Sequence, residues 1–342
     1  MHKYSISLKA LLLAVVLSLT LVSCAQAVQP TPQTGAQEGT EAVTQATNKP
    51  TVEPVTLRIV VLPILDNLPM YVAQQEGLFE AHNVKVEFIP VGSAAERDQV
   101  IVAGQADGMI NETISTLLYN KDKPQVQIVG FARTATPTAS QYSILANGQS
   151  GIKTPQDLKD VEIGISEGTI IEYITNRLLK AEGLSSEDIK TIAVPKIADR
   201  MSLLGTGELK AATLPDPLSL LAIQQGANVV IDDTKHPEYG YSTYSFLIPV
   251  IEKNPEAVRG FLAAVQEATQ MINADSSKWN NLLTEQSLVP APIIETFKLP
   301  PFPKASVPTE EQWADALAWA KEKGLVKTDI SYNDSVNSSF LP

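Results

Sequence analysis

The chain has very little cysteine and histidine, the two residues that metal sites and nucleophilic enzymes use most. Cys24 is the only cysteine in 342 residues, and the histidines are His2, His82 and His236. A lone cysteine cannot form a disulfide within the chain. No Cys/His cluster has the spacing of a metal site, and no glycine-rich phosphate loop is present. We therefore expect no metal and no cofactor, and we expect that the protein is not an enzyme.

Basic charge and long apolar runs are also scarce. The net charge is −12 and the pI is near 4.8, which argues against nucleic acid or an anionic lipid surface as a partner. Beyond the first 22 residues, no apolar run is long enough to span a bilayer. A hydrophobic content of 44% is typical of a globular α/β protein.

The N-terminus has the layout of an export signal. Lys3 and Lys9 precede an apolar run at 10–22, and Ser23 stands before Cys24. This run is too short to cross a bilayer core of ~30 Å as a helix. The string LVSC at 21–24 resembles a bacterial lipobox, which implies cleavage of a signal peptide at 1–23 and acylation of Cys24. The alternative is an ordinary signal peptide with a chance cysteine.

The segment that follows is predicted to be a disordered tether over 24–54. Its residues 25–54 include no aromatic side chain and are mainly Gln, Thr, Ala, Pro and Glu. Such a composition cannot bury enough apolar surface to offset the entropy of ordering the chain. We expect a protein that is lipid-anchored to the cell membrane on its extracytoplasmic face and has no other membrane contact.

The remainder alternates short apolar strands with helices. This β–α rhythm predicts an α/β fold with parallel sheets and helices on both faces. Its length exceeds what one core usually serves, so two lobes are expected. The predicted lobe I is 55–145 plus 242–342, and the predicted lobe II is 146–241. Extended segments near Tyr142 and Tyr244 are the predicted crossovers, which would form a hinge beside a cleft.

Six strings, taken together and in this order, resemble the NMT1/THI5-like family of solute-binding proteins. They are NLPMYVA with EGLF at 67–79, GSAAER at 92–97, GQAD at 104–107, KTPQDLK at 153–159, GISEGT at 164–169 and PDP at 215–217. The resemblance implies a two-lobed periplasmic binding protein fold of type II and a monomer that captures a small molecule for an ABC importer. The implied partners are a membrane permease and, through it, a cytoplasmic ATPase.

Within that family the strings are most similar to the riboflavin-binding branch, which makes riboflavin or a related heteroaromatic vitamin the first expected ligand. A thiamine pyrimidine precursor comes next, followed by a sulfonate, nitrate or taurine. A relative of the fold is an enzyme that makes the thiamine pyrimidine from its own histidine and bound pyridoxal phosphate, with a cysteine-rich iron motif. This chain lacks that motif.

Two kinds of residue are candidates for ligand contact. Ser93, Thr113 and Thr169 stand at predicted helix starts, where free N–H groups favour an electronegative ligand, although plain helix capping explains them equally well. Gly168 beside Thr169 permits close backbone approach. Asp216 follows a strand and faces the predicted cleft, or else caps a helix.

Aromatic rings near the strand ends would stack on a planar ligand, although core packing is the alternative for each of them. The predicted ligand-binding residues are Asn67, Leu68, Tyr71, Ser93, Asn111, Thr113, Phe131, Tyr142, Gly168, Thr169, Tyr173, Asp216 and Tyr244.

Overall fold

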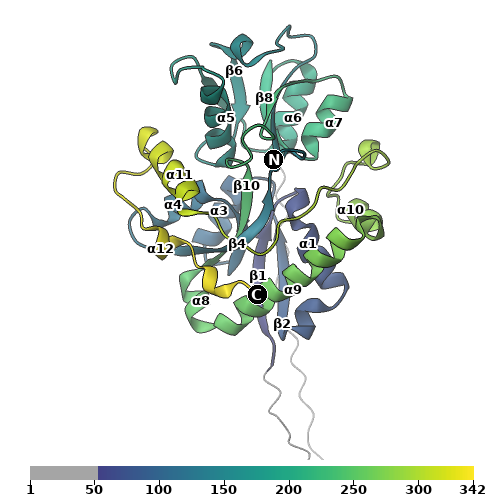
Figure 1. Ribbon diagram of the computed structural model, residues 1–342, viewed down its shortest axis with the longest axis vertical. Coiled ribbons are helices and arrows are strands. Elements are labelled where there is room, and N and C mark those ends of the chain that lie inside the picture. Colours follow the sequence, from purple (N-terminus) through teal and green to yellow (C-terminus); the bar gives the residue numbers. More distant parts are fainter. Residues whose placement is uncertain (1–52) are drawn as a thin grey trace, which may run out of the picture. The chain divides into compact units, whose positions relative to one another are not determined.

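The computed structural model describes residues 53–342, and these form two five-stranded sheets, each with helices packed on it (Figure 1). We use lobe I for the first sheet and its helices, and lobe II for the second. Cys24, the predicted signal peptide and almost all of the predicted tether lie outside the described residues. The predictions made for them stay predictions.

The sheet of lobe I has the strand order β2-β1-β3-β10-β4. Its strands are β1 (Val55–Val61), β2 (Val84–Pro90), β3 (Gly108–Asn111), β4 (Val126–Thr134) and β10 (Tyr241–Leu247). β1 runs parallel to β2 and β3, whereas β10 is antiparallel to both of its neighbours. The predicted parallel sheet is therefore mixed. β4 leads toward lobe II and β10 returns from it, so the two must run in opposite directions.

The sheet of lobe II has the order β7-β6-β8-β5-β9. Its strands are β5 (Tyr142–Ala146), β6 (Glu162–Ile165), β7 (Lys190–Ala193), β8 (Ala211–Pro215) and β9 (Asn228–Asp232). β6 is parallel to β7 and β8, and β5 is antiparallel to β8 and β9. This sheet is also mixed, for the same reason: β5 enters it from lobe I.

The predicted crossover near Tyr142 adjoins a linking segment, whereas the one near Tyr244 lies beyond the other linking segment, within a strand. Tyr142 is already the first residue of β5 and pairs with Pro215, while Tyr244 lies in mid-strand between Ile110 and Gly130. The linking segments are 135–141 and 233–240. A strand and an extended crossover have the same sequence periodicity, and only their hydrogen-bond partners distinguish them.

Helices cover both sheets. Those of lobe II are α5 (Ile170–Ala181), α6 (Ile197–Thr206) and α7 (Leu218–Gln224). On or beside lobe I are α1 (Leu68–Gln75), α2 (Leu78–Ala81), α3 (Ala94–Val102), α4 (Thr113–Asn120), α8 (Ile248–Lys253), α9 (Pro255–Ala274), α10 (Asn280–Glu285), α11 (Glu310–Glu322) and α12 (Tyr332–Ser335). Phe261 of α9 packs on Phe79, Tyr244 and Phe246 at ring-centroid distances of 5.6, 5.6 and 5.3 Å, which anchors this long helix to the sheet.

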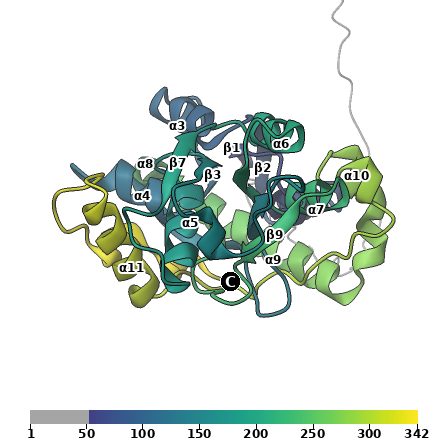
Figure 2. The same ribbon diagram turned by 90° about the horizontal axis from the view of Figure 1, so that it is seen from above.

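Helix α11 bridges the lobes. It lies beside α4 in Figures 1 and 2, and the buried Trp313 and Trp319 share one apolar core with residues of α4 and α5. Asp315 accepts hydrogen bonds from Tyr173 Oη at 2.6 Å and from Arg177 Nε at 2.8 Å, both in α5. The lobes are thus joined by a helix as well as by the two linking segments.

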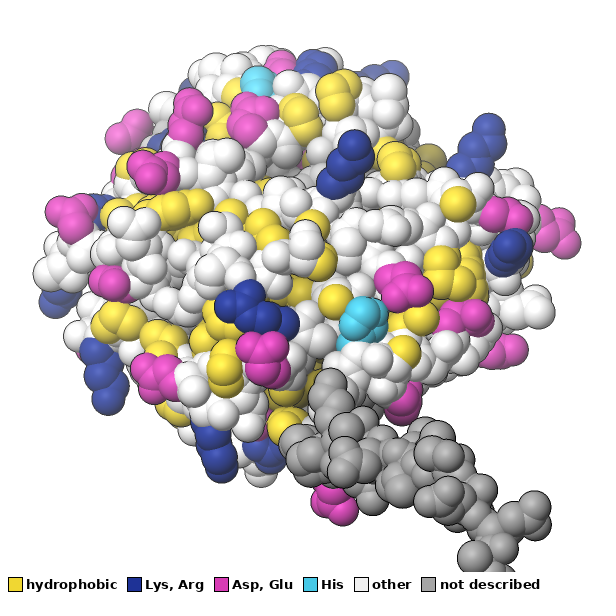
Figure 3. Space-filling view, turned by 60° about the horizontal axis from the view of Figure 1, so that its bottom comes forward, with side chains coloured by type: hydrophobic (Ala, Val, Ile, Leu, Met, Phe, Trp, Pro, Cys, Tyr) yellow, Lys and Arg dark blue, Asp and Glu magenta, His cyan; other side chains and the backbone are white. Residues whose placement is uncertain are grey.

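The surface matches the acidic composition. In the view of Figure 3, acidic and basic side chains are interspersed and form no continuous basic patch. Within residues 53–342 no helix has the length and apolar character needed to cross a bilayer. In the same residues no group of His, Cys, Asp and Glu side chains has the arrangement of a metal site.

Candidate functional site

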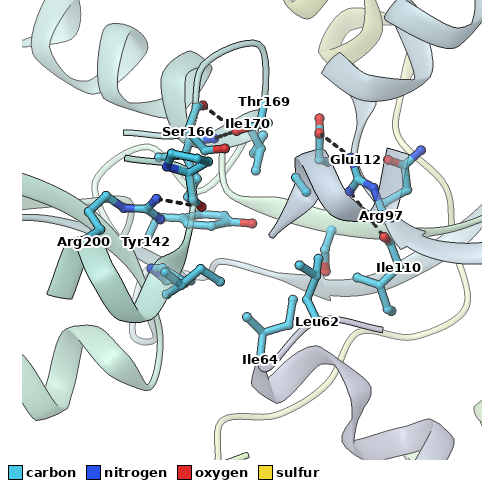
Figure 4. Close-up of a pocket in the computed structure, with 17 residues that line it drawn as sticks. Leu62, Ile64, Arg97, Ile110, Glu112, Tyr142, Ser166, Thr169, Ile170 and Arg200 are labelled. Carbon is cyan, nitrogen blue, oxygen red and sulfur yellow. Dashed lines mark hydrogen bonds and ion pairs between the residues drawn. The ribbon is translucent and has the colours of Figure 1, made fainter. Parts of the chain in front are cut away.

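A cavity of about 60 Å³ lies between the two lobes (Figure 4). It is at the carboxyl ends of strands, where open α/β sheets bind ligands: Leu62 follows β1, Asn111 ends β3, Ser166 follows β6 and Pro215 ends β8. Lobe I contributes Leu62, Ile64, Ala94, Arg97, Ile110, Asn111, Glu112 and Ser242. Lobe II contributes Tyr142, Ser166, Thr169, Ile170, Ile171, Pro195, Ile197, Arg200 and Pro215.

Two capped helices start beside the cavity. Ser93 Oγ accepts the Glu96 N–H of α3 at 3.2 Å, and Thr169 Oγ1 accepts the Ile171 N–H of α5 at 3.2 Å. Thr169 Oγ1 also donates to the Ser166 carbonyl at 2.8 Å. Both hydroxyls are therefore engaged in capping. Thr169 lines the cavity, whereas on α3 it is Ala94, next to Ser93, that does so.

The lobe I wall contains a fully paired arginine. Arg97 is 1% exposed and donates to Asp98 at 2.8 Å and to Ser115 at 2.6 Å, with Glu112 at 3.7 Å. Burial opposes its charge, but the two carboxylates outweigh that effect and raise the pKa of Arg97. Burial also raises the pKa of Glu112 above its ordinary value, against the pull of Arg97. The guanidinium is thus neutralised by protein groups on its own lobe.

The lobe II wall contains an arginine with no carboxylate. Arg200 is 0% exposed; its Nε donates to the Thr213 carbonyl at 2.8 Å and its Nη1 to the Val194 carbonyl at 2.7 Å. Among residues 53–342 no acidic side chain pairs with it, and its buried Nη2 has no hydrogen-bond partner. Burial lowers the pKa of Arg200 to about 10, so it is still charged at neutral pH.

A buried charge without a counter-ion is expensive, and a buried donor left unpaired costs about 1–3 kcal/mol. The fold nevertheless makes room for this side chain. A Cβ on Gly164 of β6 would lie 3.3 Å from Arg200 Cγ and 2.6 Å from Leu209 Cδ1, so the glycine keeps the space above β6 open. The local packing therefore accommodates the Arg200 side chain within the cavity wall.

Asp216 belongs to a buried network at the hinge. Its carboxylate accepts from Arg133 Nη2 at 3.0 Å, and the carboxylate of Asp66 is 3.7 Å from Arg133 Nη1. Asp233 accepts the backbone N–H groups of Gln141 and Tyr142 at 2.9 and 3.1 Å, tying the two linking segments together. Burial raises the pKa of Asp66 and Asp216, and raises that of Asp233 to about 7. The structure places Asp216 outside the cavity wall.

Of the predicted aromatic contacts, only Tyr142 lines the cavity. Tyr71 packs edge-on against Phe88, Phe131 against Tyr241, and Tyr173 against Trp319 of α11. Tyr244 is in the core under α9. Tyr173 and Tyr244 are buried in apolar cores, whereas Tyr71 and Phe131 are half-buried beside their aromatic neighbours.

Among the other predicted residues, too, some line the cavity and others do not. Asn111 lines the cavity and donates to Thr116 Oγ1 at 2.9 Å. Asn67 donates to the Leu62 carbonyl, and Leu68 is buried in the core. Thr113 is hydrogen-bonded to Tyr241 Oη at 3.0 Å. Gly168 has a left-handed φ of 67° and donates to the Glu172 carboxylate at 2.9 Å. Asn111, Tyr142 and Thr169 are the predicted residues that line this cavity, and a role in ligand binding stays a prediction for all of the predicted residues.

Sequence reasoning missed the two arginines of the wall. A signal for Arg200 was present: Ile197, Arg200 and Leu204 follow helical spacing and form one buried face of α6. An arginine on an otherwise apolar stripe marks either an ion pair or a ligand contact. No comparable pattern marks Arg97, because α3 contains several charged residues.

Known proteins resemble this chain over most of its folded part. The sequence model of a family described as NMT1/THI5 like matches residues 65–278. The alkanesulfonate-binding protein SsuA of Xanthomonas axonopodis pv. citri, solved with MOPS bound, superposes with a TM-score of 0.70 at 19% identity, covering 84% of this chain and 99% of that one. This likeness establishes the shared fold.

Two curated relatives differ in their names and in how much of them is matched. A protein of Escherichia coli strain K12, provisionally named for binding aliphatic sulfonates, is 30% identical over 47% of this chain and 50% of its own length. The 4-amino-5-hydroxymethyl-2-methylpyrimidine phosphate synthase of Legionella pneumophila strain Philadelphia 1 is 20% identical over 80% of this chain and 88% of its own. The chain thus aligns with only half of the first of these.

Proposed function

Because the chain belongs to the NMT1/THI5-like family, we propose that it is the solute-binding component of an ABC importer. In this role it captures a small molecule between its lobes and delivers it to a membrane permease, which a cytoplasmic ATPase drives. The observation that carries the proposal is the cavity between the lobes, whose wall is shared almost equally by the two sheets. A ligand held there contacts both lobes, so its binding energy favours their closure.

Riboflavin is the first ligand that the sequence predicts, and the geometry supports it through one ring, Tyr142. A cavity of about 60 Å³ has room for a few water molecules, so a three-ringed flavin requires the lobes to part further. The same holds, to a smaller extent, for a thiamine pyrimidine precursor and for an alkyl sulfonate of similar size. A sulfonate-type ligand is favoured by a different observation, the mostly aliphatic wall with a charged arginine in it.

An enzyme of the pyrimidine-synthase type is the alternative from another class. Its proposed chemistry would consume a histidine, and the two histidines in the described residues do not line the cavity. His82 instead lies 3.2 Å from Glu267, and His236 lies 3.5 Å from Glu238, both outside the site. This placement favours binding without conversion.

The binding role is tested by measuring the equilibrium binding of candidate solutes to the protein. Riboflavin is titrated by its fluorescence, and taurine, hexanesulfonate and the aminopyrimidine precursor by calorimetry. We expect one stoichiometric site for one of these ligands, recovery of the ligand unchanged, and a smaller radius of gyration in solution scattering at saturation. Turnover of the ligand, or saturation of several weak sites, would contradict the proposal.

We also propose that acylated Cys24 anchors the protein to the extracytoplasmic face of the membrane. The predicted tether lies between Cys24 and the folded part in the sequence, so Cys24→Ala should release the protein from membranes and leave ligand affinity unchanged. Membrane retention of the Cys24→Ala protein after signal cleavage would argue against the anchor.

A further inference from the structure

Arg200 is the one cavity-wall cation in residues 53–342 that the protein does not neutralise. Its guanidinium donates to the Thr213 carbonyl in the middle of β8 and to the Val194 carbonyl just after β7, which orients it, and its Nη2 is left without a partner. Hydrogen bonds from arginine to an ionised oxygen are among the strongest in proteins. The geometry therefore calls for an acceptor that is not part of this chain.

The surroundings of Arg200 define the rest of that molecule. Ile170, Ile171, Ile197 and Pro195 of lobe II line the cavity with it, and Leu62, Ile64 and Ile110 of lobe I line the other part. Figure 4 shows Arg200 and Tyr142 on one side of the cavity and Arg97 with Glu112 on the opposite side. Since Arg97 is already paired, Arg200 is the arginine of this wall that has no carboxylate partner among the described residues.

We propose that Arg200 selects the solute by donating Nη2 to an oxygen of an acidic group, such as a sulfonate or carboxylate, while the apolar body of the solute lies against the isoleucines. This rests on the proposed function, because it names the ligand class of the same cavity. It also ranks the candidates, since riboflavin has no acidic group. Arg200 acts here as a specificity-determining residue.

The test uses the purified full chain and matched probes, hexanesulfonate and the neutral 1-hexanol. Wild type should bind hexanesulfonate the more tightly. Arg200→Met retains the apolar stem and should weaken hexanesulfonate binding by about 10- to 100-fold, the effect of losing one charge-assisted hydrogen bond. Its affinity for 1-hexanol should not fall. Arg200→Lys, which keeps the charge without the fork, should lie between the two.

Arg58→Met is the control, because Arg58 pairs with Asp107 at the protein surface, at 2.9 Å. This variant should bind hexanesulfonate like wild type. If Arg200→Met fails to fold, Arg200→Lys decides alone: unchanged affinity for hexanesulfonate overturns the inference. Tight binding of riboflavin that is indifferent to Arg200→Met also overturns it, yet leaves the binding role intact. Failure of wild type to bind any probe or candidate solute overturns both proposals.

Discussion

The two walls of the cavity each bury one arginine, but the partners of the guanidinium differ between the two lobes. In lobe I, Arg97 is surrounded by carboxylates and a hydroxyl from its own lobe. In lobe II, Arg200 has only backbone carbonyls, and one of its nitrogens is unpaired among the described residues. The difference teaches that equal burial does not imply an equal role. Arg97 is paired within its own lobe, whereas Arg200 is the residue that we propose for ligand contact.

The largest expected effect separates the two arginines by stability. Arg97→Met removes the partner of the buried Glu112 and should lower the free energy of unfolding by about 3–5 kcal/mol, as for other broken buried ion pairs. Arg200→Met strands no carboxylate and should cost much less. Urea denaturation of both variants measures the difference. Equal losses of unfolding free energy in the two variants would contradict the proposed difference between the two arginines.

A smaller effect is expected from pH, and it sharpens the comparison. Both arginines stay charged near neutral pH, whereas Asp233 in the hinge network changes its charge there. Burial raises the pKa of Asp233 to about 7, above its ordinary value. The folded state therefore favours the protonated carboxyl, and this stabilisation is complete below about pH 4 and lost as pH rises through 7. The loss is at most about 4 kcal/mol, from 1.36 kcal/mol per pKa unit.

Asp233→Asn should flatten the fall in unfolding free energy between about pH 4 and pH 8. Part of the slope should persist, because burial also raises the pKa of Asp66 and Asp216. Asp122→Asn, at an exposed position, is the control and should retain the wild-type slope. A variant Asp233→Asn with an unchanged slope would assign the pH response to other groups.

The smallest effect concerns how firmly the two walls are held together. Asp315→Asn weakens the bonds from Tyr173 and Arg177 to α11, and should lower the unfolding free energy by about 1 kcal/mol, since the carboxylate is partly exposed. Solution scattering should show a larger radius of gyration without ligand. Asp329→Asn removes an exposed ion pair with Lys321 and is the matched control. An unchanged radius in Asp315→Asn would indicate that the hinge alone sets the spacing of the lobes.

Much of the fold could be predicted from local patterns. The apolar runs of β1, β3 and β8, the capping residues Ser93 and Thr169, and the β–α rhythm depend on neighbours in sequence, and the structure confirms them. The extended segment at Tyr142 was predicted as a crossover, with residues up to 145 in lobe I, but it is a strand of lobe II, since it pairs with β8 residues about 70 positions away in the chain.

The residues of the site were less predictable, because the direction in which a side chain points decides whether it reaches the cavity. Tyr142 and Tyr244 both stand in strands, yet one ring faces the cavity and the other faces α9. Asp216 follows a strand as predicted, but Arg133, 83 residues earlier, draws it into the hinge network. No pattern within either segment contains that information.

By itself, the sequence determined the α/β class, the helix starts at Ser93 and Thr169 and the resemblance to the family, because these follow from composition, periodicity and short strings. The tertiary structure alone decided which buried charges are paired. Asp98 is next to Arg97 in the sequence, but folding brings Glu112 to Arg97 and leaves Arg200 without a carboxylate. Electrostatic energy depends on distances through space, and for these side chains the partners are set by how the strands and helices pack.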